Sequence, residues 1–154
     1  DHTGQIASFP KATLLIGKYE WDAITAPTPA AGVNFKPFEH WIKGEGKVEP
    51  LPNDKDVFGD GSVIVMAAPG HTPGHRMAMA RLKNMGAVIL SGDAVHFREN
   101  YETNGVPWFN YDRAQTLATI GRIKGLVKSQ KATLIIQHDA RDIEKLPKFP
   151  AAAN

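Results

Sequence analysis

The segment from Ser62 to His75 reads SVIVMAAPGHTPGH, in which an apolar, β-branched run passes directly into a loop with two histidines. Apolar runs bounded by proline and glycine are typical of buried strands. The same arrangement occurs twice more: AVIL at 87–90 precedes Ser91-Gly92-Asp93, and ATLII at 132–136 precedes Gln137-His138-Asp139. Strand ends that gather at one edge of an α/β sheet form the usual crevice for ligands. We therefore expect His71, Asp93 and His138 to converge, although they are far apart in the sequence.

Strands and helices alternate along the rest of the chain. The clearest predicted helix covers 112–129, where apolar side chains recur near a 3.6-residue period and Asp112, followed by Gln115, resembles a capping box. The other predicted elements are strands at 11–17 and 77–82, a helical turn at 18–25, a long loop at 27–52 and an irregular tail from Leu146. Because apolar strands interleave with helices, we predict an α/β (α+β layered) fold with sheets covered by helices.

Composition narrows the class of protein. A chain of 154 residues suits one domain or a large piece of one, and its 42% hydrophobic and 22% charged residues are ordinary for a globular protein. The net charge of +2 does not suggest nucleic acid or a membrane surface as a partner, and no apolar run approaches the ~20 residues of a membrane span. The absence of cysteine excludes disulfides and thiolate metal sites, and leaves the compartment open between cytoplasmic and periplasmic or secreted.

The polar residues after the three strands suit a metal site. Imidazole and carboxylate ligands without thiolate fit zinc, iron or manganese. A single histidine is more often hydrogen-bonded at the surface or in the core than bound to metal, and Asp93 alone is also consistent with a turn cap. A metal site is expected here because His71, Asp93 and His138 each follow an apolar strand.

Four motifs in order resemble those of the metallo-β-lactamase-fold hydrolases. They are Asp1-His2-Thr3-Gly4, which resembles the end of an HxHxDH motif, the segment from Ala68 to His75, Ser91-Gly92-Asp93, and Gln137-His138-Asp139. The similarity covers essentially the whole chain. It implies an αββα sandwich whose N-terminal part is missing, with 1–154 forming a single domain that corresponds to the C-terminal portion of such a hydrolase.

The resemblance also implies a site with two divalent metal ions, with zinc as the expected metal. Asp1, His2 and His138 would bind one ion, His71 the other, and Asp93 would bridge them. The two family histidines that would precede Asp1 are absent. We therefore expect the 154 residues expressed alone to be inactive.

Within this superfamily the chain is most similar to the N-acyl-homoserine lactonases. The residues that suggest this are the run from Ser91 to Phe97 and Gln137-His138-Asp139, with Asp142-Ile143 close behind. In that group a tyrosine commonly lies three residues after the bridging aspartate and contacts the substrate carbonyl, and here the position is His96. An aspartate at position 93 argues against the zinc β-lactamases that use cysteine there.

The activity that follows is opening of lactone rings in a small-molecule substrate, with N-acyl-homoserine lactones (quorum quenching) as the expected class. A hydroxide held between the metals would attack the carbonyl, one metal and His96 would stabilise the oxyanion, and Asp1 would pass a proton to the leaving alkoxide. Two alternatives stay open. One is another hydrolase on the same scaffold, such as a thioesterase, phosphotriesterase or arylesterase, and the other is a non-catalytic metal-binding or partner-binding domain. The sequence does not determine the oligomeric state.

Other residues have ordinary interpretations beside functional ones. His75 either orients the metal site or bonds a loop carbonyl, and we favour the loop carbonyl. Aromatic residues could form an apolar wall for an acyl chain, although core and loop packing is the simpler interpretation for any one of them. They are Phe35, Phe38, Trp41, Trp108, Phe109 and Tyr111.

Overall fold

The computed structural model describes residues 2–28 and 33–154, and its contacts divide the chain into two compact units. The first unit is Asp1–Pro52 and the second is Asn53–Asn154. Each is described by itself. Within the described ranges, no helix is both long and apolar enough to cross a membrane.

The first unit is built on two parallel strands, β1 (Leu14–Gly17) and β2 (Val48–Leu51). Its helices are η1 (Ile6–Ser8), α1 (Lys18–Ile24), η2 (Lys36–Phe38) and α2 (Glu39–Ile42). Phe38 and Trp41 are buried at 8% and 2% exposure and pack with Leu14, so core packing is the correct interpretation for these two aromatics.

The prediction that 27–52 forms a long loop is wrong for its second half, which contains η2, α2 and β2. The strand β2 was missed because Pro50 interrupts the apolar pattern. Proline lacks the backbone N–H that an interior strand requires, and here it is tolerated at the edge of a two-stranded sheet, opposite Ile16. The helix α2 is only four residues long and too short for a periodic pattern.

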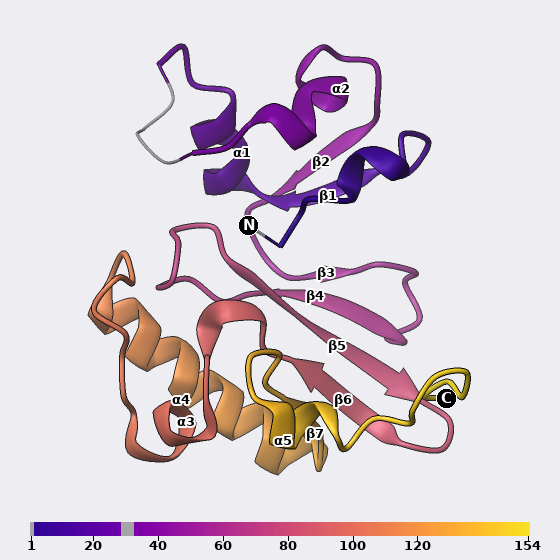
Figure 1. Cartoon of the computed structure of the whole chain (residues 1–154), viewed down its shortest axis with the longest axis vertical. Coiled ribbons are helices and arrows are strands. Elements are labelled where there is room, and N and C mark those ends of the chain that lie inside the picture. The colour runs from indigo at the N-terminus through magenta and orange to yellow at the C-terminus, as the bar shows by residue number, and fades with distance from the viewer. Residues whose placement is uncertain (1, 29–32) are drawn as a thin grey trace. The chain divides into compact units, whose positions relative to one another are not determined.

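The second unit contains a five-stranded sheet in the order β3-β4-β5-β6-β7 (Figure 1). The strands are β3 (Lys55–Asp56), β4 (Val63–Ala67), β5 (Arg76–Leu82), β6 (Gly86–Leu90) and β7 (Thr133–Ile135). Pairing is antiparallel from β3 to β6 and parallel between β6 and β7. The strands β4, β6 and β7 therefore all run in one direction and end at the same edge of the sheet. This confirms the predicted strands and the α/β class.

The crossover from β6 to β7 carries η3 (Gly92–Ala94), α3 (Arg98–Thr103) and α4 (Arg113–Gln130), and α5 (Ala140–Ile143) follows β7. The helix α4 confirms the predicted helix. Its N-cap is Asp112, whose side chain accepts the backbone N–H of Gln115 at 2.8 Å. The helices α3 and α5 were not predicted, because one is polar throughout and the other has only four residues.

The main core lies between α4 and the sheet. Figure 1 shows α4 lying along one face of the strands, and Ile120 and Ile123 of this helix are fully buried. They belong to one cluster with Met66 of β4 and Ile89 of β6. Burial of such side chains contributes about 1.5–3 kcal/mol each and fixes the helix against the strand ends.

A buried carboxylate closes the end of β7. Asp142 of α5 is 1% exposed, and its Oδ2 accepts the backbone N–H of Ile136 at 3.0 Å. Its Oδ1 receives Arg98 Nε at 2.8 Å and lies 2.7 Å from Lys145 Nζ. Burial opposes ionisation, but hydrogen bonds from Lys145 and Arg98 outweigh it and hold the pKa of Asp142 below its ordinary value. Asp142 thereby joins β7, α3 and α5.

We predict that Asp142→Asn destabilises the second unit at neutral pH by about 1–3 kcal/mol, because Arg98 and Lys145 then face a neutral amide in place of a carboxylate. The lowered folded-state pKa means that this stability is present above the ordinary carboxyl pKa of 3.8 and is lost as pH falls through the folded-state value. Urea unfolding at several pH values measures it. The difference between the two proteins should shrink in acid, and an unchanged difference would contradict the role of the carboxylate.

Candidate metal centre

The three polar segments predicted to converge do so at one edge of the second unit. His71 lies in the loop after β4, Asp93 in η3 after β6, and His138 in the loop after β7. They meet because these three strands run in the same direction. The sheet topology therefore explains how residues up to 67 positions apart in the sequence reach one site.

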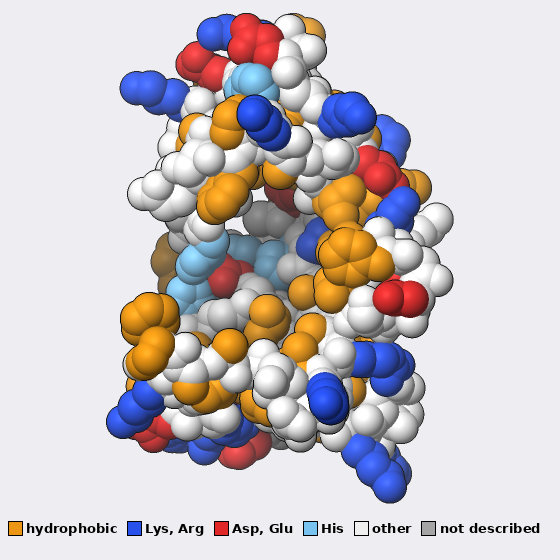
Figure 2. Space-filling view, turned by 90° about the vertical axis from the view of Figure 1, so that its right-hand side faces the viewer, with side chains coloured by type: hydrophobic (Ala, Val, Ile, Leu, Met, Phe, Trp, Pro, Cys, Tyr) orange, Lys and Arg blue, Asp and Glu red, His pale blue; other side chains and the backbone are white. Residues whose placement is uncertain are grey.

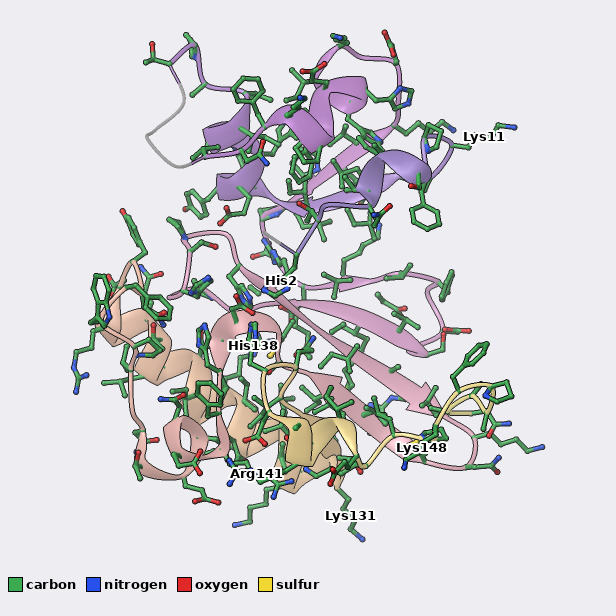
Figure 3. The ribbon with its side chains drawn as sticks, viewed as in Figure 1. His2, Lys11, Lys131, His138, Arg141 and Lys148 are labelled. Atoms are coloured by element: carbon green, nitrogen blue, oxygen red, sulfur yellow. The ribbon has the colours of Figure 1, made fainter. Side chains whose placement is uncertain are left out.

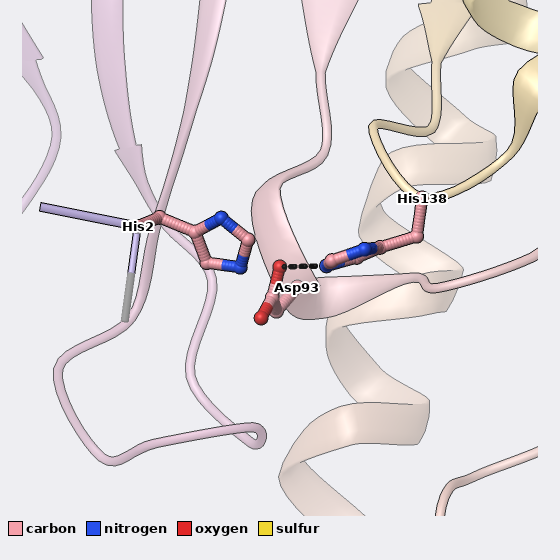
Figure 4. Close-up of side chains that lie close together, drawn as sticks. All are labelled: His2, Asp93 and His138. Atoms are coloured by element: carbon pink, nitrogen blue, oxygen red, sulfur yellow. Dashed lines mark hydrogen bonds and ion pairs between the residues drawn. The ribbon is translucent and has the colours of Figure 1, made fainter. Parts of the chain in front are cut away.

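Asp93 is at the centre of the cluster, and its side chain is 9% exposed. Oδ2 lies 3.4 Å from His71 Nε2. Oδ1 lies 3.0 Å from His138 Nε2, a contact drawn as a dashed line in Figure 4. Each carboxylate oxygen thus faces a different imidazole. A carboxylate that bridges two ions needs this arrangement.

His96 is part of the same cluster. Its Nε2 lies 4.0 Å from Asp93 Oδ2, and its ring stacks on His138 at 5.3 Å with 11° between the planes. The ring of His71 is also 5.3 Å away. Figure 2 shows the result on the surface, where pale blue histidine side chains lie next to a red acidic side chain. The predicted role of His96, a contact with the substrate carbonyl, is compatible with this position.

The donor set fits a divalent metal. Ligand atoms of His71, Asp93 and His96 all lie within 4.8 Å of one another, and His138 approaches from the other oxygen of the carboxylate. Imidazole and carboxylate donors are those of catalytic zinc sites, which commonly use three protein ligands. His96 is therefore both a candidate ligand and a candidate substrate contact, and the geometry accommodates either role.

The two remaining predicted ligands, Asp1 and His2, belong to the first unit, which is described by itself. Asp1 lies outside the described residues. His2 is an exposed residue of the first unit. Their roles as metal ligands stay predictions from the resemblance.

The loop that carries His71 is fixed to the N-terminal end of α4. Gly70 has φ +136°, and a Cβ there would lie 2.4 Å from the hydroxyl of Thr116. The hydroxyl of Thr119 donates to the Pro69 carbonyl at 2.7 Å, and the Asp112 N–H donates to the Gly70 carbonyl at 3.0 Å. The glycine is required because helix and loop are in direct contact.

His75 supports the loop that carries Asp93. Its Nε2 accepts the backbone N–H of Asp93 at 2.9 Å, so Nδ1 carries the proton and donates to the Ala68 carbonyl at 3.1 Å. The bond to Ala68 confirms the loop-carbonyl role favoured from the sequence. The bond from the backbone N–H of Asp93 adds a second role, because it fixes the main chain that carries the carboxylate. The loop-carbonyl interpretation of His75 is thus confirmed, and a role in orienting a metal site stays a prediction.

A charged network supports the loop that carries His138. Asp139 caps α5, accepting the backbone N–H of Arg141 at 3.0 Å, and it also accepts the backbone N–H of Arg98 at 3.0 Å. Hydrogen bonds from the Arg141 guanidinium hold the pKa of Asp139 well below its usual range. Figure 3 labels His138, in the loop after β7, and Arg141, in α5. The backbone on the C-terminal side of His138 is therefore held by an ionised carboxylate.

Aromatic side chains border the cluster. Phe109, in the loop before α4, meets the rings of His71 and His96 edge-on at 6.0 and 5.3 Å. Trp108 packs on Phe109 at 5.8 Å and is 93% exposed, and Tyr111 is exposed beside it. Phe35, in the first unit, is also exposed. Phe109 and Trp108 are placed to serve as the apolar wall expected from the sequence.

Comparison with known proteins identifies the class. No family model matches the chain. Its fold matches a solved N-acyl homoserine lactone hydrolase that has the product N-hexanoyl-L-homoserine bound at its catalytic metal centre. The TM-score is 0.82 at 25% identity, over 98% of this chain and 56% of that one. The chain has the metallo-β-lactamase fold, as its motifs predicted.

Within that class, the curated relatives are N-acyl homoserine lactonases. The chain is 29% identical to AttM of Agrobacterium fabrum, over 98% of this chain and 60% of AttM. It is 27% identical to AiiA of Bacillus thuringiensis subsp. kurstaki, over 97% of this chain and 56% of AiiA. The chain spans little more than half the length of these relatives and matches their C-terminal part. The resemblance to the lactonase group is confirmed.

We predict that Gly92→Ala disturbs the centre through His75. Gly92 has φ +53°, and a Cβ there would lie 2.8 Å from the His75 ring. Backbone strain and overpacking together should cost about 2–4 kcal/mol and weaken zinc binding. Thermal unfolding and zinc titration measure both effects.

The matched control is Gly86→Ala. Gly86 has φ +69° with nothing within 4 Å of the Cβ position, so the substitution adds backbone strain without a clash. It should cost about 1 kcal/mol and leave zinc binding intact. Equal losses of zinc affinity in the two variants would show that the contact with His75 does not support Asp93.

Proposed function

We propose that the protein containing this chain is a metal-dependent hydrolase that opens lactone rings, with N-acyl homoserine lactones as its substrates. The observation that carries the proposal is the Asp93 carboxylate, which faces His71 through one oxygen and His138 through the other. Relatives over nearly the whole chain are N-acyl homoserine lactonases, which supports this substrate class.

His71, Asp93 and His138, together with Asp1 and His2, are the proposed ligands of two divalent ions, with zinc as the proposed metal. When bound, such ions supply Lewis acidity and lower the pKa of water toward neutrality. The chain's own residues then orient the reacting groups. Phe109 and Trp108 provide apolar surface for the acyl chain.

His96 is the proposed hydrogen-bond donor to the carbonyl oxygen as negative charge develops there. It replaces the tyrosine that is common in the lactonase group, and its ring is held between His138 and Phe109. Water supplies the oxygen that bonds to the carbonyl carbon. As the bond between that carbon and the ring oxygen breaks, the proton released by the water passes to the ring oxygen through Asp1, the proposed donor. The product is an open-chain hydroxy acid.

A substrate panel tests this proposal on the full-length protein loaded with zinc. We expect kcat/KM for N-hexanoyl homoserine lactone to exceed that for a thioester, an aryl ester and a phosphotriester by at least about tenfold, or ~1.4 kcal/mol of transition-state stabilisation. Asp93→Ala should lose both bound metal and hydrolysis. Faster turnover of the thioester or phosphotriester would assign another hydrolase activity, and metal content without any turnover would support a binding domain.

The role of His96 is separable from metal binding. We predict that His96→Ala lowers kcat about a hundredfold, or ~3 kcal/mol, while the metal content is unchanged. His96→Tyr should retain most of the rate, because a phenol also donates a hydrogen bond. Kinetics and elemental analysis on the same samples measure this. Loss of zinc from His96→Ala would instead make His96 a metal ligand, and a change in KM alone would make it a pocket wall.

A further inference from the structure

Asn110 connects the candidate centre to α4 through its side chain. It lies two residues before the helix N-cap, in the loop that also carries Phe109. Its Oδ1 is 3.1 Å from His71 Nδ1, and its Nδ2 donates to the Thr116 hydroxyl at 3.1 Å. The contact to His71 joins residues 39 positions apart in the sequence.

Thr116 determines which way the Asn110 amide points. Its hydroxyl donates its single proton to the Asp112 carbonyl at 2.7 Å, so towards Asn110 it acts only as an acceptor. The NH2 group of Asn110 must therefore face Thr116, and the amide oxygen must face His71. Thr116 is 1% exposed, so water does not compete for its hydroxyl. This chain of donors and acceptors assigns the amide orientation, which electron density alone seldom does.

The amide orientation determines the tautomer of His71. An acceptor at Nδ1 requires that Nδ1 carry the proton, and the neutral ring then has its lone pair on Nε2. Nε2 is the nitrogen that faces Asp93, at 3.4 Å from Oδ2. The nitrogen directed into the centre is thus the one able to bind a metal.

The contact between the Asn110 side chain and His71 is not needed to hold the two loops together. The loop is already attached to the backbone around His71, because the Tyr111 N–H donates to the His71 carbonyl at 3.1 Å and the Asp112 N–H to the Gly70 carbonyl at 3.0 Å. The Asn110 side chain instead reaches the imidazole ring. We propose that Asn110 is a positioning residue that, with Thr116, fixes the His71 ring in the Nδ1–H tautomer and keeps Nε2 available for metal. This inference rests on the proposed metal site.

The first test reads the tautomer directly in the unmodified full-length protein without metal. Long-range 1H–15N correlation spectra distinguish a protonated from an unprotonated ring nitrogen. We expect His71 to be protonated at Nδ1. A ring protonated at Nε2 alone, with Nδ1 unprotonated, would overturn the proposal, whatever the substrate of the protein.

The second test changes Asn110. Asn110→Ala removes the acceptor and should give a mixture of His71 tautomers and a zinc affinity 10- to 100-fold weaker. Asn110→Asp keeps an oxygen towards Nδ1 and should restore both the single tautomer and most of the affinity. Near-UV circular dichroism checks that each variant is folded. A folded Asn110→Ala protein with one tautomer and unchanged zinc affinity would overturn the proposal.

The two proposals fail differently. The tautomer is measured without metal or substrate, so an absence of lactone hydrolysis would refute the proposed function and leave the role of Asn110 standing. Lactone hydrolysis together with an Nε2-protonated His71 would refute the role of Asn110 alone.

Discussion

The shared direction of β4, β6 and β7 is the constraint on which the candidate centre depends. Antiparallel pairing from β4 through β5 returns the chain to its first direction at β6, and the crossover through α4 brings β7 parallel to it. Each of these strands ends in a loop with one polar residue of the cluster. A strand that ran the other way would carry its histidine or aspartate to the opposite edge of the sheet.

Each loop is then held from outside by a different group. The loop with His71 packs against α4, where Gly70 lies directly against Thr116. The loop with Asp93 is held by a hydrogen bond to the ring of His75. Asp139 holds the loop with His138. The three supports come from a helix, an imidazole and an ionised carboxylate, so no single interaction positions the whole cluster. Preorganisation of this kind lets ligand atoms stay close without a covalent link.

Much of the second unit was predictable because it follows simple periodic rules. The apolar strands have clear patterns, and Asp112 marks the start of α4, whose buried face includes the polar residues Thr116 and Thr119. Residues that follow a strand directly, such as Asp93, were found by the same reasoning. The first unit was harder to predict, because Pro50 interrupts the strand pattern of β2. The pairing of β2 with β1 also depends on contacts between residues distant in sequence. The part played by Asn110 had no sequence signal, because its partner His71 is on another loop.

The segment from Asn104 to Asp112 has two sides with different freedom to change during evolution. Asn110 points its amide inward to His71 and Thr116, whereas Trp108 and Tyr111 are 93% and 69% exposed. Substitutions at the exposed positions reshape the surface beside the centre without moving its histidines, because the inward contacts are made by a different residue. Natural drift and laboratory selection can therefore alter this surface at little cost to folding, while position 110 is held to side chains that present an oxygen.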